Sequence, residues 1–200
     1  MAQIQGDIIL EGRTVTLIPM ASSHKEALFE AVGKPEVWQY TWGHLTTLED
    51  ISDAVERALA HQRSGSHIPF VIVDNASGRI VGATRIGDMD AANRNAEIGW
   101  TWLSPDVWRT RVNTECKFLL LSHVFEQMHV LRVQFSVSSY NLRSQRAVER
   151  IGAVREGIFR KHRIKVDGTI HDNIFYSILD TEWPEVKSNL LYLLETKYSE

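Results

Sequence analysis

One short stretch limits the fold of this chain more than any other: residues 139–153, which read SYNLRSQRAVERIGA. The pattern predicts the end of a strand, an N-capping Asn141 and a short helix that closes at Gly152. One face of this helix is formed by the residues at i, i+3, i+4 and i+7, which are Ser144, Ala147, Val148 and Ile151. Ser144 is therefore predicted to point its hydroxyl inward near a helix N-terminus, where the helix dipole favours negative charge.

The rest of the chain alternates strand and helix patterns, with no linker, low-complexity segment or internal repeat. Strands are predicted at 14–19, 68–74, 80–85, 95–103, 131–137, 153–166 and 170–179. Helices are predicted at 23–33, 47–63 and 114–128, and a last one begins at Trp183-Pro184. The first two helices are headed by capping-box patterns, Ser23-x-x-Glu26 and Thr46-x-x-Glu49. This alternation predicts one domain of the α/β type.

The predicted strand 95–103 carries a carboxylate with a candidate function. Regular alternation places Ile98, Trp100 and Trp102 on one face of the strand, and Glu97, Gly99 and Thr101 on the other. Gly99 inside a strand indicates a bulge or a close backbone approach. Glu97 is therefore expected mid-strand, beside an irregularity.

Composition excludes several classes of protein. Of the 200 residues, 44% are hydrophobic and 24% are charged, as is typical of a soluble globular domain. We expect no membrane association, because the sequence contains no run of about 18 apolar residues and no signal-peptide pattern. The single Cys116 excludes a disulfide framework and favours a reducing cytoplasm. The histidines show no metal-ligand spacing, so no metal is expected.

Charge is distributed unevenly along the chain. The net charge of −3 argues against DNA as a partner, yet residues 143–165 hold eight basic and two acidic residues. This basic segment is either a solvated face or a rim for an anionic cofactor or partner. The sequence leaves both readings open.

The helix that begins at Asn141 resembles the cofactor-side helix of the GNAT superfamily of acyl-CoA N-acyltransferases, most closely its RimJ/RimL-like branch. The resemblance runs from about Gly12 to Trp183 and is closest from Val130 onward. It implies a GNAT fold, of the α+β class with layered α/β elements, in which helices flank a mixed, twisted central sheet. The sheet is expected to splay near Glu97, so that the pantetheine arm of the cofactor can add to it. The implied domain covers 10–183, and 184–200 forms a C-terminal helix packed on the same domain.

The same resemblance implies acetyl-CoA as the co-substrate, held where a loop feeds a helix N-terminus. In this family the loop reads Gln/Arg-x-x-Gly-x-Gly/Ala. Arg109 matches its first position, whereas Val112 and Thr114 stand where small residues are usual. The implied cofactor-binding residues are Leu103, Arg109, Thr110, Arg111, Val112, Asn113, Thr114, Asn141 and Ser144.

Two residues are implied as catalytic. Many GNAT enzymes protonate the thiolate leaving group with a tyrosine seven residues after the asparagine, but this position is Val148 here. Ser144 resembles the serine that the RimJ/RimL branch uses instead, as a hydrogen-bond donor to the sulfur. Glu97, in a Glu-Ile-Gly-Trp context, resembles the glutamate that lies beside the substrate amine as base. Ser144 packed against its own helix and Glu97 as a surface residue are the structural alternatives.

We therefore expect acetyl transfer from acetyl-CoA to a primary amine by direct attack, with a protein or peptide N-terminal α-amine as one candidate acceptor. A small-molecule amine is the alternative acceptor. A non-catalytic CoA-binding domain is the second alternative, and Val112 and Val148 favour it. A homodimer is a candidate assembly. Three aromatic residues either line an acceptor cleft or pack under a loop: Trp38, Tyr40 and Trp42.

Overall fold

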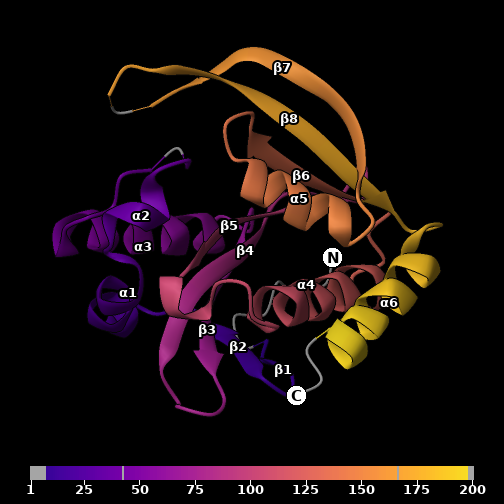
Figure 1. Cartoon of the computed structure of the whole chain (residues 1–200), viewed down its shortest axis with the longest axis horizontal. Coiled ribbons are helices and arrows are strands. Elements are labelled where there is room, and N and C mark those ends of the chain that lie inside the picture. The colour runs from indigo at the N-terminus through magenta and orange to yellow at the C-terminus, as the bar shows by residue number, and fades with distance from the viewer. Residues whose placement is uncertain (1–7, 42, 166, 198–200) are drawn as a thin grey trace.

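A mixed eight-stranded sheet forms the centre of the computed structural model, which describes residues 8–41, 43–165 and 167–197 (Figure 1). The strand order is β1-β2-β3-β4-β5-β6-β8-β7. The strands are β1 (Leu10–Glu11), β2 (Val15–Pro19), β3 (Ile68–Asp74), β4 (Ile80–Asp90), β5 (Asn95–Leu103), β6 (Arg132–Ser138), β7 (Val154–Ile164) and β8 (Ile170–Leu179). Within the described residues, β5–β6 is the one parallel pair and the other neighbours run antiparallel.

Helices cover both faces of the sheet (Figure 1). On one face lie α1 (Lys25–Val32), α2 (Pro35–Trp38) and α3 (Leu48–Arg63), and on the other lie α4 (Val112–Ser122), α5 (Leu142–Arg150) and α6 (Trp183–Tyr192). Short 3-10 turns occur at Ser22–His24 and Pro105–Val107, and π-helical turns at His123–Gln127 and Leu193–Lys197. Adjacent strand residues alternate between the two cores: Val71 packs with α1 and α3, and Ile72 packs with α4.

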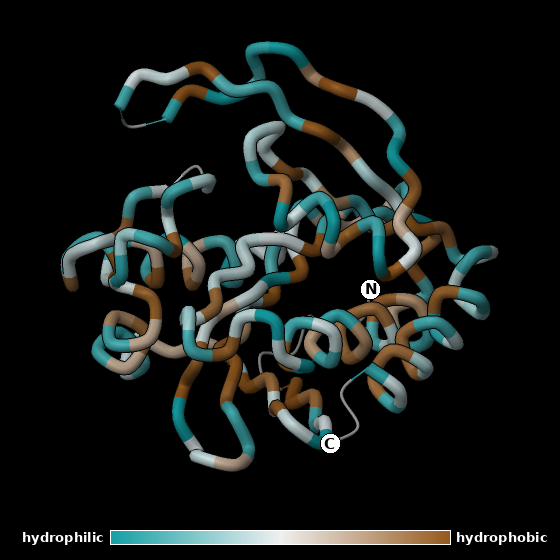
Figure 2. The backbone as a smooth tube through the Cα atoms, viewed as in Figure 1, coloured by the Kyte–Doolittle hydropathy of each residue, from teal (hydrophilic) through white to brown (hydrophobic). Residues whose placement is uncertain are grey.

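The buried faces follow the sequence pattern. Hydrophobic residues are concentrated in the central strands and on the inner sides of the helices (Figure 2). Trp183, Val186 and Leu190 of α6 join the core beneath α4, so this C-terminal helix packs on the same body as the sheet. Among the described residues, no helix has the length and apolar character needed to cross a membrane.

Most predicted elements are confirmed, with differences at helix starts. The helix expected from 114 begins at Val112, and the sequence analysis missed the short β1 and α2. Both predicted capping boxes are wrong. The box of α3 lies one residue later, where Thr47 Oγ1 accepts from Asp50 N (3.1 Å) and Asp50 Oδ2 accepts from Thr47 N (3.0 Å). Before α1 the chain makes a 3-10 turn instead, and Ala21 N donates to His24 Nδ1 (3.1 Å).

A β-bulge interrupts β5, as Gly99 suggested. Arg85 of β4 pairs with Gly99, while Ala83, two residues earlier in β4, pairs with Trp102 three residues later in β5. The extra residue is accommodated at Trp100, which adopts a left-handed backbone with φ +48°. A bulge of this kind reverses the side-chain alternation beyond it.

The predicted faces of β5 are therefore wrong beyond the bulge. Trp100 and Trp102 leave the face of Ile98 and join the α3 face, where Trp102 packs with the α1–α3 core. Thr101 turns toward α4 instead, and its Oγ1 accepts from the buried Lys117 Nζ (2.9 Å). Two indoles thus stand on the same side of the sheet as Glu97.

At one edge of the sheet, β8 and β7 extend as a long curved arm (Figure 1). Every residue of β7 is at least partly exposed, because β7 is the edge strand. The turn at Asp167-Gly168 is confirmed, with Gly168 at φ +82°. The basic segment therefore lies partly on α5 and partly on this exposed arm.

Candidate active site

The parallel pairing between β5 and β6 ends abruptly. It joins only Asn95–Glu97 of β5 to Arg132–Gln134 of β6, although the strands run on to Leu103 and Ser138. The two strands therefore diverge immediately after Glu97, as expected. The divergence leaves backbone N–H and C=O groups of both strands without a ladder partner from the other, which is the arrangement that an extended ligand arm can complete.

Two helix N-termini flank this divergence. The chain after β5 runs through Trp108, whose Nε1 donates to Leu103 O (2.9 Å), and enters α4 at Val112. From the other side, α5 directs Arg143 over the Trp108 ring, with 3.8 Å between the guanidinium carbon and the ring centroid. The segment before α4 and the start of α5 are therefore in direct contact. The sequence analysis did not select Arg143.

The first turn of α4 differs from the predicted loop. Val112 and Thr114 are buried, at 3% and 0% exposure, so their side chains belong to the core. Arg150 Nη2 of α5 donates to Thr114 Oγ1 (2.9 Å) and ties the two helices together. The side chains that replace the usual small residues thus point inward, and the turn keeps the backbone geometry of a helix N-terminus. Asn113 lies half-buried beside them.

The residues that lead into α4 divide into structural and accessible ones. Thr110 Oγ1 donates to Val107 O (2.7 Å) and accepts from Val112 N (3.3 Å). Arg111 Nη2 donates to Leu194 O (3.1 Å), which directs this side chain toward the C-terminal turn. Arg109 is exposed, with φ +64°, and is the arginine of this loop placed to meet a ligand from solvent.

A buried carboxylate holds the start of α4 in place. Glu115 is 5% exposed and accepts three backbone hydrogen bonds, from Arg13 N (3.1 Å), Thr14 N (2.6 Å) and Val15 N (2.9 Å). Gly12 also packs closely here, because a Cβ at this position would lie 2.9 Å from the Glu115 carboxyl carbon. No sequence signal indicated this contact between segments 100 residues apart.

The helix of the opening motif forms as predicted. Asn141 Oδ1 accepts from Ser144 N (3.0 Å), and the chain leaves the helix through Gly152 at φ +104°. Ser144 is half-buried, and its hydroxyl makes no hydrogen bond with any residue that the structure describes. The Tyr176 hydroxyl cannot take the place of Ser144 as a donor to the sulfur, because it is buried and donates to Glu149 Oε1 (2.9 Å). Burial, and to a smaller extent the Glu149 carboxylate, raises the pKa of Tyr176 to about 12.

Glu97 lies at the point where β5 and β6 part. Burial raises the pKa of Glu97, and the hydrogen bond from Gln134 Nε2 (2.9 Å) partly opposes this. Asp88 raises the pKa further, while Arg163 of the arm lowers it. A carboxyl group with a raised pKa retains its proton affinity nearer to neutral pH, as a general base requires. Sequence reasoning missed Gln134, although it occupies an outward position of a strand that alternates cleanly.

Small polar side chains continue this face of the sheet beyond Gln134. Asn173 of β8 is fully buried, and its Nδ2 donates to Ser136 Oγ (2.6 Å) while its Oδ1 has no partner among the described residues. Phe159 and Phe175 pack on each other beside them, with ring centroids 4.2 Å apart. Polar side chains of β6 and β8, with an aromatic pair beside them, therefore line this face of the sheet.

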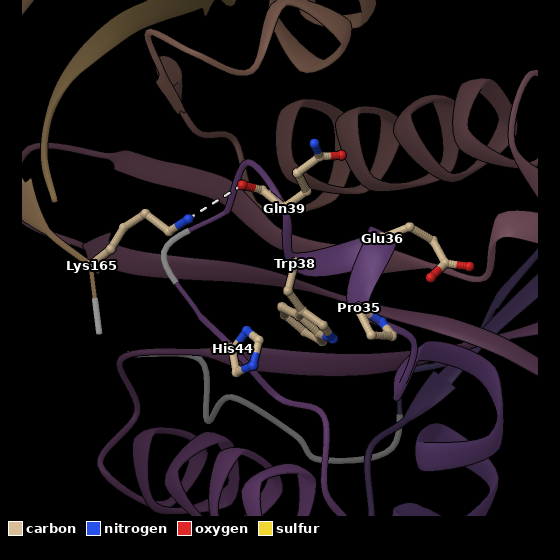
Figure 3. A pocket seen from close by; sticks show the side chains of 6 residues that line it. All are labelled: Pro35, Glu36, Trp38, Gln39, His44 and Lys165. Carbon is tan, nitrogen blue, oxygen red and sulfur yellow. Dashed lines mark hydrogen bonds between the residues drawn. The ribbon is translucent and has the colours of Figure 1, made fainter. Parts of the chain in front are cut away.

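The tip of the arm reaches back to α2. Lys165 Nζ donates to Gln39 O (3.3 Å) across a pocket of about 280 Å³ (Figure 3). Trp38 is 2% exposed and donates to Val32 O (2.8 Å), so it packs in the core and only borders this pocket. Tyr40 is 40% exposed, and Trp42 lies outside the described residues.

Other reactive side chains are placed as structural groups. Cys116 is fully buried, and burial raises the pKa of its thiol to about 12. No group of three or more potential metal ligands occurs within residues 8–41, 43–165 and 167–197.

Comparisons with known proteins bear on the family and the fold of this chain. Residues 14–154 match the family model described as "Acetyltransferase (GNAT) domain". The Bacillus subtilis (strain 168) protein named "Putative ribosomal N-acetyltransferase YdaF" is 32% identical over 106 residues, which are 53% of this chain and 57% of that relative. The chain therefore spans little more than half of YdaF. The B. subtilis "Uncharacterized N-acetyltransferase YoaA" is 27% identical over 176 residues, 86% of this chain and 96% of that one.

A solved structure extends the match to the whole fold. The crystal structure of a GCN5-related N-acetyltransferase from Brucella melitensis superposes with a TM-score of 0.88 at 29% identity, over 98% of this chain and 89% of that chain. The family model covers well over half of the sequence, and the fold superposes on that solved structure over nearly the whole chain. This chain therefore belongs to the GNAT family of acetyltransferases.

Proposed function

We propose that this enzyme transfers the acetyl group of acetyl-CoA to the α-amine of a protein or peptide N-terminus by direct attack, with Glu97 as the base and Ser144 as the donor to the leaving group. The observation that carries the proposal is the position of Glu97, a half-buried carboxylate at the point where β5 and β6 diverge. The name of YdaF, a relative over about half of this chain, supports a ribosomal protein as acceptor.

The residues present fit acetyl-CoA. The diverging strands offer backbone groups for a pantetheine arm, and the N-terminus of α4 offers amides for a pyrophosphate. Arg109 and Arg143 add two positive charges beside the segment that leads into α4. When bound there, acetyl-CoA supplies the acetyl group as a thioester. In this proposal Leu103, Asn113 and the first turn of α4 contact the cofactor mainly through their backbones.

The two sides of the divergence would then perform different parts of the reaction. An acceptor ammonium must lose a proton before it attacks, and Glu97 can take this proton directly or through one water. As the thioester bond breaks, charge develops on the sulfur. Ser144 can donate a hydrogen bond to it, because its hydroxyl has no partner among the described residues and lies at the start of α5.

Thermal stability in the presence of acetyl-CoA tests the cofactor assignment. Ligand that binds only the folded state raises the melting temperature, by a free energy of about 2.7 kcal/mol at 100 times Kd. We expect such a rise with acetyl-CoA and with CoA. An unchanged melting temperature at millimolar ligand would remove the assignment.

Release of CoA with a mixed panel of peptides and small amines tests the function itself. We expect Glu97→Gln to lower kcat by about 10²–10⁴-fold while acetyl-CoA still raises the melting temperature. Glu30→Gln is the control, because Glu30 is an exposed glutamate on α1, far in sequence from the site. Turnover only with small amines would favour the small-molecule alternative, and binding without turnover would favour a CoA-binding domain.

A further inference from the structure

Arg85 is a buried cation that has no counter-ion among the residues the structure describes. Arg85 of β4 is 5% exposed, and among the described residues its guanidinium has a single hydrogen-bond acceptor, Ala54 O of α3, 3.3 Å from Nη2. Trp100 and Trp102 flank it, with ring centroids 5.8 and 5.7 Å from the guanidinium carbon. Most of its five N–H donors therefore lack an acceptor.

The charges around Arg85 do not compensate it. No carboxylate that the structure describes lies within 4.0 Å of its nitrogens. The neighbouring charge that affects it is a second cation, Arg57 of α3. Burial, and then Arg57, lower the pKa of Arg85 to about 10. Buried arginines in proteins are ordinarily paired with an anion, so an arginine held in this state is poised to receive one.

The unpaired nitrogens are not completely enclosed. The fully enclosed side-chain atoms without partners, in the described part of the chain, include none of Arg85. Its Nε and Nη1, which have no hydrogen-bond partner among the described residues, therefore keep a small contact with solvent. The two indoles cover the rest of the guanidinium, so an anion that entered would meet it with little competing water.

Arg85 also lies on the same face of the sheet as the proposed base. It pairs across the ladder with Gly99, and a Cβ on Gly99 would lie 3.2 Å from Glu97 Oε1. The Glu97 carboxylate thus extends over the glycine that faces Arg85. On the same side of the sheet, Gly87 pairs with Glu97. Because Gly87 has no side chain, the ring of Trp100 occupies the space that a Cβ would fill. A group attached to an amine at Glu97 can therefore extend along the face of the sheet on which Arg85 also lies.

We propose that Arg85 binds a carboxylate of the acceptor, so that the enzyme selects amines that carry a carboxylate near the reacting nitrogen. This inference rests on the proposed function, because it takes Glu97 as the position of the amine. A guanidinium matches a carboxylate through two parallel N–H···O bonds. Two sources share this chemistry: the side chain of an acidic residue near a peptide N-terminus, and the α-carboxylate of a free amino acid.

A structural role for Arg85 makes the opposite prediction about stability. If the arginine mainly joins α3 to the sheet through Ala54 O and the two indoles, Arg85→Met should lower the melting temperature. If it is kept for an anionic ligand, Arg85→Met removes an uncompensated buried charge at similar volume. The melting temperature should then stay the same or rise.

Calorimetric titration into the enzyme–CoA complex tests the proposal without requiring turnover. Two matched pairs separate the sources: C-terminally amidated peptides that begin Ala-Asp or Ala-Asn, and free alanine against alaninamide. We expect the wild-type enzyme to bind the carboxylate member of one pair about 10–100-fold more tightly. We expect Arg85→Met to abolish this preference, and the exposed Arg79→Met to retain it.

The outcomes are decisive in each direction. Equal binding of both members in both pairs by the wild-type enzyme overturns the proposal, and this result needs no variant to fold. A preference that survives in Arg85→Met also overturns it. Failure of acetyl transfer with every amine, while the carboxylate preference and its loss in Arg85→Met persist, would reject the proposed function but support the carboxylate site.

Discussion

Replacement of Glu115 by alanine offers the sharpest test of how this fold holds the start of α4 in place. The Glu115 carboxylate accepts N–H groups from three consecutive residues that lead into β2. Val15 is 0% exposed, so no water can replace its lost partner, and an unsatisfied buried donor costs about 1–3 kcal/mol. Arg13 and Thr14 are at least partly exposed, and water can recover part of their bonds, at a net loss of about 0.5–1.5 kcal/mol each.

Removal of the carboxylate also removes the free-energy cost of burying its charge. The net loss of stability from the three hydrogen bonds is therefore about 3 kcal/mol. For a chain of this size each kcal/mol corresponds to about 2–4 °C in melting temperature, so Glu115→Ala should melt about 6–12 °C lower. The melting temperature of Glu115→Gln should lie between those of Glu115→Ala and the wild type, because the amide oxygen can still accept from Thr14 N and Val15 N.

Urea unfolding and calorimetry would measure both variants beside Glu30→Ala, an exposed glutamate on α1. We expect this control to remain within about 0.5 kcal/mol of the wild type. A Glu115→Ala protein within 1 kcal/mol of the wild type would refute the reasoning. The three hydrogen bonds to Glu115 would then stabilise the folded state no more than hydrogen bonds to water do.

Three further predictions concern Gln134, Ser144 and Gly82. Gln134→Leu removes the bond that favours the charged form of Glu97, so the Glu97 pKa should rise and the acid limb of the kcat/KM profile should move to higher pH; an unmoved limb would assign it to another group. Ser144→Ala should lower kcat by about 10–100-fold with little change in acetyl-CoA affinity, and full kcat at saturating acceptor would remove its role. Gly82→Ala should destabilise the protein by about 1–3 kcal/mol in urea titration, because its Cβ would lie 2.1 Å from Trp102 O; unchanged stability would mean that β5 can shift at that point.

The local elements were predictable because their signals lie within a few residues of each other. Asn141 and Gly152 bound α5 in the sequence as they do in the structure. The hairpin turn between β7 and β8 was predictable for the same reason, since Asp-Gly favours a tight turn. The family pattern also placed the divergence of the sheet beside Glu97.

Side-chain direction beyond an irregularity was less accessible. Gly99 indicated a bulge, but not which residue would absorb it, and every side chain after that residue changes face. Trp100 and Trp102 therefore appeared to be partners of Ile98, whereas the structure places them around Arg85. The start of α4 was also misplaced, because Val112 is a poor helix signal that tertiary burial overrides.

The sequence by itself determined which segments form strands and helices, where α5 begins, and which family the chemistry belongs to, because these depend on short-range pattern and spacing. Only the tertiary structure decided which distant groups meet. Glu115 reaches the backbone of Arg13 across 102 positions, and Gln134 reaches Glu97 across 37. The unpaired charge of Arg85 exists only after folding, because whether a buried cation has a counter-ion depends on every segment packed around it.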